Sequence, residues 1–167
     1  MATEKWIGGS GVGLTWTSCF GAEINSVVDG NAVLAGGGTV ATNQIDNSTS
    51  LDLFADVMFA LGSWGAVGAA ALLSLYIYPL NQDGSTYGDG RFTSSAAGPP
   101  PAQYFAGIGV LVPSVTQAQQ GHFRRPDGAP IIIPPAKFKF ALYNKSGATL
   151  AASANTIYYR TYNRQVA

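Results

Sequence analysis

The chain has 167 residues, of which 47% are hydrophobic and only 11% are charged, with nine acidic residues balancing nine basic ones. A soluble domain ordinarily carries about 25% charged residues, so we expect other subunits to cover much of this surface. The lack of net charge argues against nucleic acid or acidic lipid as a partner. The low charge, together with the high content of Gly, Ser, Thr, Ala and Asn, favours an assembly component over an enzyme.

The first 13 residues are predicted to form a flexible N-terminal arm, because glycines dominate positions 8–13. The arm carries Trp6 and Ile7, an apolar pair that gains by ordering on a neighbouring subunit, so both are candidate partner contacts. Residues 14–167 are predicted to form a single domain, long enough to bury a core. The lone Cys19 excludes an internal disulfide and is interpreted as a small buried residue.

Short runs of strand-forming residues, separated by clusters of Gly, Pro, Asn and Asp, continue to the end of the chain. No segment shows a sustained helical pattern. These features are typical of an all-β protein and predict an antiparallel β-sandwich. The predicted strands are residues 14–20, 27–34, 39–41, 51–61, 70–78, 104–112, 129–133, 137–143 and 156–162.

Two of these strands alternate cleanly between apolar and polar residues. The odd-numbered positions of residues 51–61 are all apolar, whereas Asp52 and Asp56 lie on the opposite face, which meets solvent or a neighbour. In residues 137–143 the lysines, Lys139 among them, are predicted to point outward. The predicted core consists of Leu53, Val57, Phe59, Leu75, Ile77, Phe138, Phe140 and Leu142.

One apolar run could be mistaken for a membrane span. Residues 57–82 carry no charge, but glycines interrupt the run and Pro79 closes it, so we expect buried strands that turn between residues 63 and 68. The first residues lack the basic and apolar regions of a secretory signal. The chain is therefore expected to be made in a host cytoplasm and to contact no membrane.

Residues 81–102 form the longest break and end in a run of prolines, which favours a stiff extended segment that reaches over a neighbouring subunit. Oxygen-bearing side chains at every second residue from Asn81 to Asp89 suggest a calcium loop, but no Glu closes it as in an EF-hand. Turns capped by Asn and Asp side chains explain the same residues. No cofactor is predicted.

Catalytic motifs are missing from the sequence. His122 is the only histidine, and no nucleophile motif accompanies it. The sequence contains neither a zinc motif nor a phosphate-binding glycine loop. The chain is therefore predicted not to be an enzyme.

Arginine and tyrosine, which are enriched in interfaces, mark two further candidate contact regions. Arg124 and Arg125 are interpreted as a salt-bridged or interfacial pair, because binding nucleic acid would require a larger basic patch. In the last predicted strand, four such residues share one face: Tyr158, Arg160, Tyr162 and Arg164. Either that face binds a partner, or its arginine stems cover tyrosine rings within one subunit.

Five segments of the chain resemble a known group of proteins in their overall residue pattern. Residues 51–57, 75–90, 98–102, 138–144 and 159–165 resemble small structural proteins of tailed-phage virions. The resemblance implies a virion component, specifically a capsid decoration (cement) protein of jelly-roll type, and it carries no catalytic motif.

Two functions are therefore expected. A decoration protein would clamp neighbouring major capsid subunits or other virion proteins, as a homo-oligomer and without nucleic acid. Alternatively, a sandwich displayed on the virion or its tail would bind host-surface carbohydrate through exposed aromatic residues such as Trp64, Tyr87 or Tyr104.

Overall fold

The computed structural model describes residues 4–7, 15–37, 42–65, 68–69, 71–88, 95–113 and 116–166, with the backbone alone for 4–7 and 164–166. Within these ranges there are two short 3-10 helices, η1 (Ala22–Ile24) and η2 (Ala102–Tyr104), and no α-helix. The strands are β1 (Glu4–Ile7), β2 (Thr17–Ser18), β3 (Asn31–Leu34), β4 (Ile45–Asp46), β5 (Phe54–Leu61), β6 (Leu72–Pro79), β7 (Ser95–Ala97), β8 (Phe105–Val110), β9 (Gln119–Phe123), β10 (Ile131–Ile132), β11 (Lys137–Lys145) and β12 (Thr156–Val166). No helix in this part of the chain is long and apolar enough to cross a membrane.

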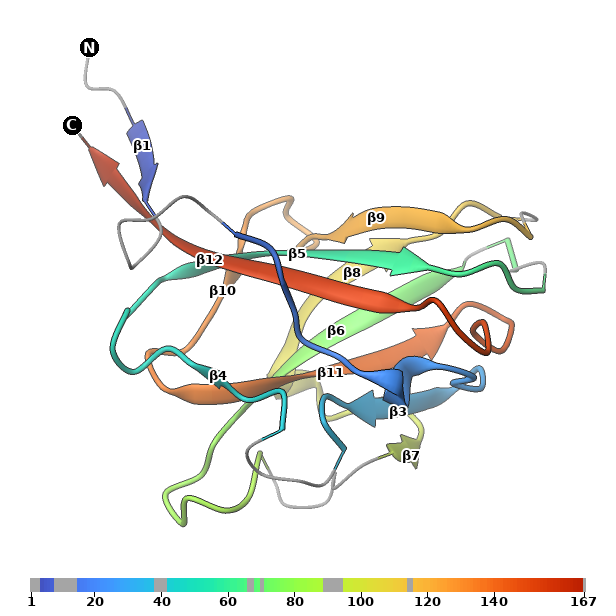
Figure 1. Cartoon of the computed structure of the whole chain (residues 1–167), viewed down its shortest axis with the longest axis horizontal. Coiled ribbons are helices and arrows are strands. Elements are labelled where there is room, and N and C mark those ends of the chain that lie inside the picture. The colour runs from blue at the N-terminus through green and yellow to red at the C-terminus, as the bar shows by residue number, and fades with distance from the viewer. Residues whose placement is uncertain are drawn as a thin grey trace.

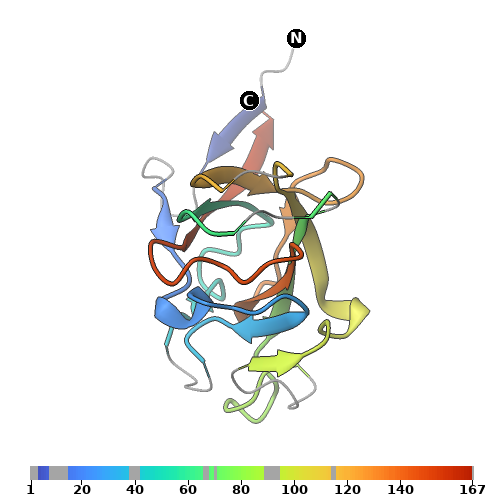
Figure 2. The same ribbon diagram turned by 90° about the vertical axis from the view of Figure 1, so that its right-hand side faces the viewer.

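The strands form two antiparallel sheets, which confirms the predicted β-sandwich (Figure 1). In the first sheet β12 and β5 are central, with β1 and β2 paired to β12 and with β9 and β10 paired to β5. The second sheet has the order β7-β3-β11-β6-β8, and β4 also pairs with β11. Viewed from one end, the strands of both sheets surround a common interior (Figure 2).

Strand pairing is nested along the chain. β2 pairs with β12, β3 with β11, β5 with β9 and β10, and β6 with β8. In this order the first strands pair with the last and the inner strands pair with one another, as in a long folded hairpin, which is the topology of a jelly roll. The two sheets meet along one side, where Ile108 of β8 and Arg124 exchange backbone hydrogen bonds.

The core lies between the sheets and contains seven of the eight predicted residues: Val57, Phe59, Leu75, Ile77, Phe138, Phe140 and Leu142. The eighth, Leu53, is 56% exposed, so this prediction is wrong. Leu53 precedes β5, so the apolar alternation of the sequence continues past the residues that the sandwich encloses.

Three charged residues that were predicted to point outward are buried. Asp52 is 2% exposed and accepts hydrogen bonds from the Thr161 hydroxyl and the Asn163 amide on β12. Asp56 is 7% exposed and Lys139 is fully buried. Partners far away in the sequence cover each of them, so the alternating pattern alone could not predict their burial.

A second apolar cluster explains the burial of Lys139, because it covers the outer face of the second sheet. Its buried members are Ala32, Leu34, Tyr76, Tyr78, Tyr87 and Ala141. Tyr87 comes from the segment after β6, and the ring of Tyr104 lies 4.4 Å from that of Tyr78. Gly88 lets the segment after β6 lie close to the Tyr78 ring, since a Cβ at this position would be 2.2 Å from that ring.

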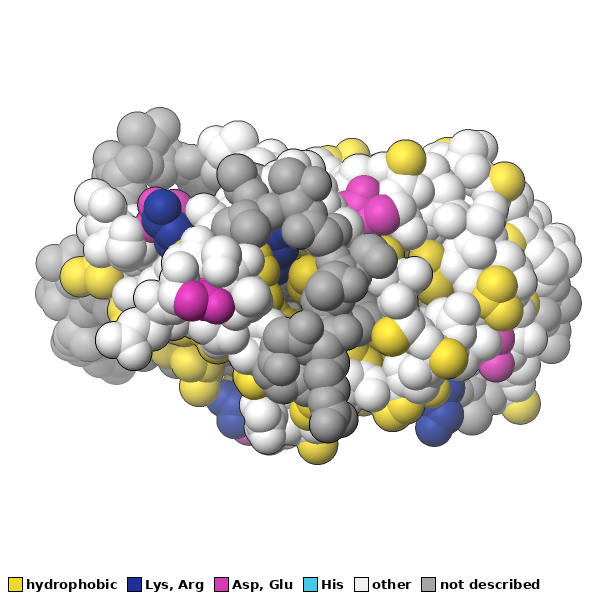
Figure 3. Space-filling model, turned by 90° about the horizontal axis from the view of Figure 1, so that it is seen from below, with side chains coloured by type: hydrophobic (Ala, Val, Ile, Leu, Met, Phe, Trp, Pro, Cys, Tyr) yellow, Lys and Arg dark blue, Asp and Glu magenta, His cyan; other side chains and the backbone are white. Residues whose placement is uncertain are grey.

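The segment predicted as a long loop therefore folds back onto its own sheet where it is described. Residues 95–97 form β7, which pairs with β3 at the edge of the second sheet. Figure 3 shows the lower side of the molecule, where charged side chains are few and scattered. Within 81–102, Tyr87 is buried and residues 95–97 pair with β3, whereas residues 82–86 are exposed and residues 89–94 lie outside the described residues.

Four strands were not predicted: β1, β4, β7 and β9. Of the predicted arm, residues 4–7 form β1, which pairs with the last residues of β12, while residues 1–3 and 8–13 lie outside the described residues. The strand predicted at 39–41 also lies outside them. The chain between 61 and 72 does not close a hairpin, because it connects β5 of the first sheet to β6 of the second.

Candidate functional site

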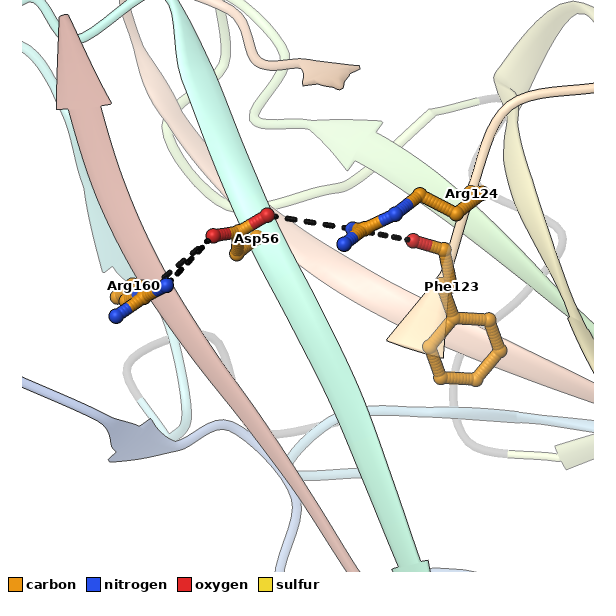
Figure 4. Close-up of polar contacts among 4 residues, drawn as sticks. All are labelled: Asp56, Phe123, Arg124 and Arg160. Atoms are coloured by element: carbon orange, nitrogen blue, oxygen red, sulfur yellow. Dashed lines mark hydrogen bonds and ion pairs between the residues drawn. The ribbon is translucent and has the colours of Figure 1, made fainter. Parts of the chain in front are cut away.

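The outer face of the first sheet carries a charged cluster centred on Asp56 (Figure 4). Arg160 donates from Nη2 and Nε to Asp56 Oδ2 over 3.0 and 3.2 Å. Arg124 donates from Nη1 to Asp56 Oδ1 over 3.2 Å and to the Phe123 carbonyl over 3.3 Å. One buried carboxylate thus holds two guanidinium groups.

Strand register places these groups together. Arg160 of β12 lies directly opposite Asp56 of β5, and Arg124 follows the last residue of β9 on the other side of β5. The Asp56 side chain is 10% exposed, whereas those of Arg124 and Arg160 are 43% and 29% exposed. Solvent therefore meets guanidinium groups over most of this cluster.

Trp16 extends the cluster toward β2. Its ring lies 4.5 Å from the Arg160 guanidinium carbon and 6.0 Å from the His122 ring. Trp16 is half-buried and His122 is exposed. Neither residue was predicted in this role, because their contacts join segments that are far apart in the sequence.

A pocket of about 390 Å³ adjoins the cluster and is lined by Phe105, Ala106, Arg125, Pro126 and Ile132. It lies where one edge strand is interrupted. β9 pairs with residues 57–61 of β5 and β10 pairs with residues 54–55, so the chain between β9 and β10 loops out of the sheet beside Asp56. Arg125 in this loop pairs with Asp127 at 2.8 Å.

The structure separates the remaining candidate contacts of β12. Tyr158 and Arg160 are half-buried, but Tyr162 is fully buried and its ring stacks 5.8 Å from that of Phe54. Tyr162 is therefore a packing residue of this subunit, not an exposed contact. The alternative prediction was that arginine stems on this face cover tyrosine rings. In the structure Arg160 instead lies over the ring of Trp16.

The backbone brings the other candidates of β1 and β12 together. Trp6 lies directly opposite Arg164, and Ile7 lies opposite Asn163. Beyond Asn163, among the residues that the structure describes, β12 pairs with β1 alone, and this two-stranded ribbon projects from the sandwich (Figures 1 and 2).

The three aromatic residues suggested as sugar platforms do not form an exposed platform. Trp64 is 8% exposed and Tyr87 is 6% exposed. Tyr104 is half-buried against Tyr78. The prediction that these three residues are exposed and could bind sugar is therefore wrong.

The suggested calcium loop uses its oxygen atoms within the chain. Asp83 accepts hydrogen bonds from the Ser85 and Thr86 amides and from the Thr86 hydroxyl. The Thr86 hydroxyl and these amides lower the pKa of Asp83 to about 2. Among the described residues, no group of three or more His, Cys, Asp or Glu side chains could hold a metal ion.

Cys19 is buried, and its Sγ donates to the Ile157 carbonyl over 3.4 Å. Burial raises the pKa of this thiol well above its usual value. A buried, protonated thiol is a poor nucleophile, which agrees with its interpretation as a packing residue.

No protein-family model, curated protein or solved structure matches this chain. The arguments for function therefore rest on the residues and their arrangement.

Proposed function

We propose that this protein is a non-enzymatic structural protein of a phage virion, specifically a capsid decoration protein that stabilises contacts between major capsid subunits. The observation that carries the proposal is the ribbon of β1 and the end of β12, which projects beyond the sandwich. An isolated two-stranded ladder is only marginally stable in water. Docking on a neighbouring virion subunit would supply the missing cover.

The ribbon also concentrates residues suited to such a contact. Trp6 and Arg164 occupy opposite positions in it, and both residue types are frequent in the energetic centres of interfaces.

Surface composition supports the same function. Only 11% of the residues are charged, and several large apolar side chains are exposed: Val28, Leu51, Leu53, Phe105, Val110, Val112 and Ile132. Jelly rolls occur in viral capsid proteins and in lectins alike, so the fold by itself does not choose between assembly and sugar binding.

Sugar binding remains the second candidate function, on different residues from those first expected. Trp16 and Tyr158 are half-exposed on the outer face of the first sheet. Sugars pack on aromatic rings, but Arg160 already occupies one side of the Trp16 ring. This contact makes sugar binding the weaker of the two proposed functions.

Copy number distinguishes the two functions. Virions of the phage that carries this gene would be purified, and this chain quantified against the major capsid protein by gel densitometry. A decoration protein is expected in stoichiometric copies on the head. A few copies per particle, together with binding of the purified chain to immobilised glycans, would overturn the proposal.

The role of the ribbon is tested with particles assembled without this chain. Deletion of residues 2–12 is expected to leave the melting temperature of the sandwich nearly unchanged and to weaken binding to these particles. Trp6→Ala is expected to reproduce most of that loss, whereas Lys5→Ala on the same strand serves as the matched control. Binding by the truncated chain at full strength would exclude the ribbon as an anchor.

A further inference from the structure

Most of the side chains that line the pocket beside the charged cluster are apolar, and two of them stay partly exposed. Phe105 and Ile132 line it and are 37% and 58% exposed. Its volume of about 390 Å³ falls within the range of pockets that accept ligands. Filling it with a large apolar side chain would remove both residues from water at once.

Cationic groups border this pocket. Arg125 lines it directly, and the neighbouring Arg124 belongs to the Asp56 cluster. Three guanidinium groups, of Arg124, Arg125 and Arg160, face two carboxylates here, so among the side chains that the structure describes the cluster carries one excess positive charge.

The arrangement of these pairs leaves the cations available. Asp56 lies beneath its arginines, with its side chain 10% exposed, while Arg124 is 43% exposed. The pair of Arg125 and Asp127 lies at the surface, where an ion pair contributes only about 0–1 kcal/mol. Arg125 can therefore exchange Asp127 for a carboxylate of a partner at little cost.

These features together define the chemistry of the occupant. The apolar lining requires a large apolar side chain, and a guanidinium binds a carboxylate through two parallel hydrogen bonds. A single excess charge is too little for a nucleic acid backbone. An acidic sugar would place hydroxyl groups against the side chains of Phe105, Pro126 and Ile132, which offer them no hydrogen-bonding groups.

We infer that the loop between β9 and β10, with Arg124 and Arg125 beside the pocket of Phe105 and Ile132, docks a protein segment in which a large apolar side chain lies next to a carboxylate. The inference rests on the proposed function, because it names the chemistry that a neighbouring virion protein presents to this chain. It adds a second contact surface, separate from the ribbon.

The test measures binding of single variants to particles assembled without this chain. Arg125→Glu reverses the charge at the rim, and Ile132→Asp removes the apolar lining. The matched controls are Lys145→Glu, at an exposed cation on β11, and Val112→Asp, at an apolar side chain that is 60% exposed. All four positions are exposed or half-buried, and equal melting temperatures confirm that the variants fold.

Both surface variants are expected to weaken binding at least tenfold, with the controls within twofold of the unmodified chain. Binding of the unmodified chain is also expected to weaken as sodium chloride is raised from 50 to about 500 mM, because exposed ion pairs are screened. If the chain binds particles and both variants bind equally well, the inference is overturned while the proposed function stands.

A parallel arm uses immobilised sialylated glycans. Binding to these glycans that is lost in Arg125→Glu, without binding to particles, would overturn the inference and the proposed function together. Binding to neither probe would have the same consequence.

Discussion

The outer faces of the two sheets differ in how far the chain itself covers them. On the second sheet, the chain's own segment after β6 covers the strands, so that Tyr76, Tyr78 and Tyr87 are buried. On the first sheet, Trp16 and a cluster of ion pairs remain half-exposed. The protein therefore covers the outer face of the second sheet with its own chain and leaves that of the first sheet partly open to solvent.

The difference appears in how each face treats charge. Lys139 on the covered face is fully buried, with Nζ 5.1 Å from the centre of the Tyr87 ring. Burial lowers the pKa of this lysine. Asp56 on the open face is shielded by two arginines that keep contact with water. A covered face thus stabilises the fold, whereas an open charged face can exchange partners.

The largest effect is expected from Tyr78→Ala on the covered face. Removing a buried ring creates a cavity and is expected to lower the free energy of unfolding by about 3–5 kcal/mol. Tyr158→Ala on the open face is the matched control and is expected to cost less than about 1 kcal/mol. Urea denaturation measures both, and equal losses would contradict the difference between the faces.

Asp56→Ala tests the open face. The change removes the acceptor of two charged donors and is expected to cost about 2 kcal/mol. Asp127→Ala removes the acceptor of an exposed pair and is expected to cost at most about 1 kcal/mol. Should the Asp127 variant lose as much stability as the Asp56 variant, the cluster would have no special role in the fold.

Lys139→Met tests the covered face through pH. Replacing a buried charge by an apolar side chain of similar size is expected to stabilise the protein by about 1 kcal/mol near pH 7. Because the pKa is lowered in the folded state, the unfolded chain binds more protons between that pKa and 10.5, so stability of the unmodified protein rises with pH in this window. The advantage of the methionine variant should therefore shrink as pH approaches 10.5.

The quantity to follow is the difference in the free energy of unfolding between the methionine variant and the unmodified protein at each pH. Tyrosines with raised pKa values, such as Tyr76 and Tyr87, titrate in both proteins, so this difference isolates the lysine. Lys137→Met, at an exposed lysine paired with Asp46, is the control and should show no such trend. An advantage that stays constant to pH 10.5 would mean that Lys139 is not destabilised by burial.

The smallest effect is expected from Leu53→Ala, which marks where the enclosed part of β5 begins. Its side chain is 56% exposed, so the loss should stay within about 0.5 kcal/mol. Leu61→Ala, at the buried end of the same strand, should cost about 2–5 kcal/mol. Comparable losses at both positions would place Leu53 in the core after all.

Sequence patterns predicted the regular parts of this fold. Alternation in residues 51–61 and 137–143 identified strands β5 and β11 and most of the core, because a strand with one buried face repeats every two residues. Strand β9 escaped detection, since its polar residues, among them His122, show no such repeat. Arg124 and Arg125 were interpreted as salt-bridged or interfacial, but the distant partner of Arg124, Asp56, was not predicted.

Composition and alternation by themselves determined that the chain is an antiparallel β-sandwich with few charged residues, because these properties depend on residue type and on neighbours in the sequence. Only the tertiary structure decided that Lys139 and Asp56 are buried and that the segment after β6 covers its own sheet. It also brought Trp16 to Arg160 and placed a pocket beside Arg125. Those outcomes depend on strands that meet across the nested pairing of a jelly roll, and a local sequence pattern carries no information about distant partners.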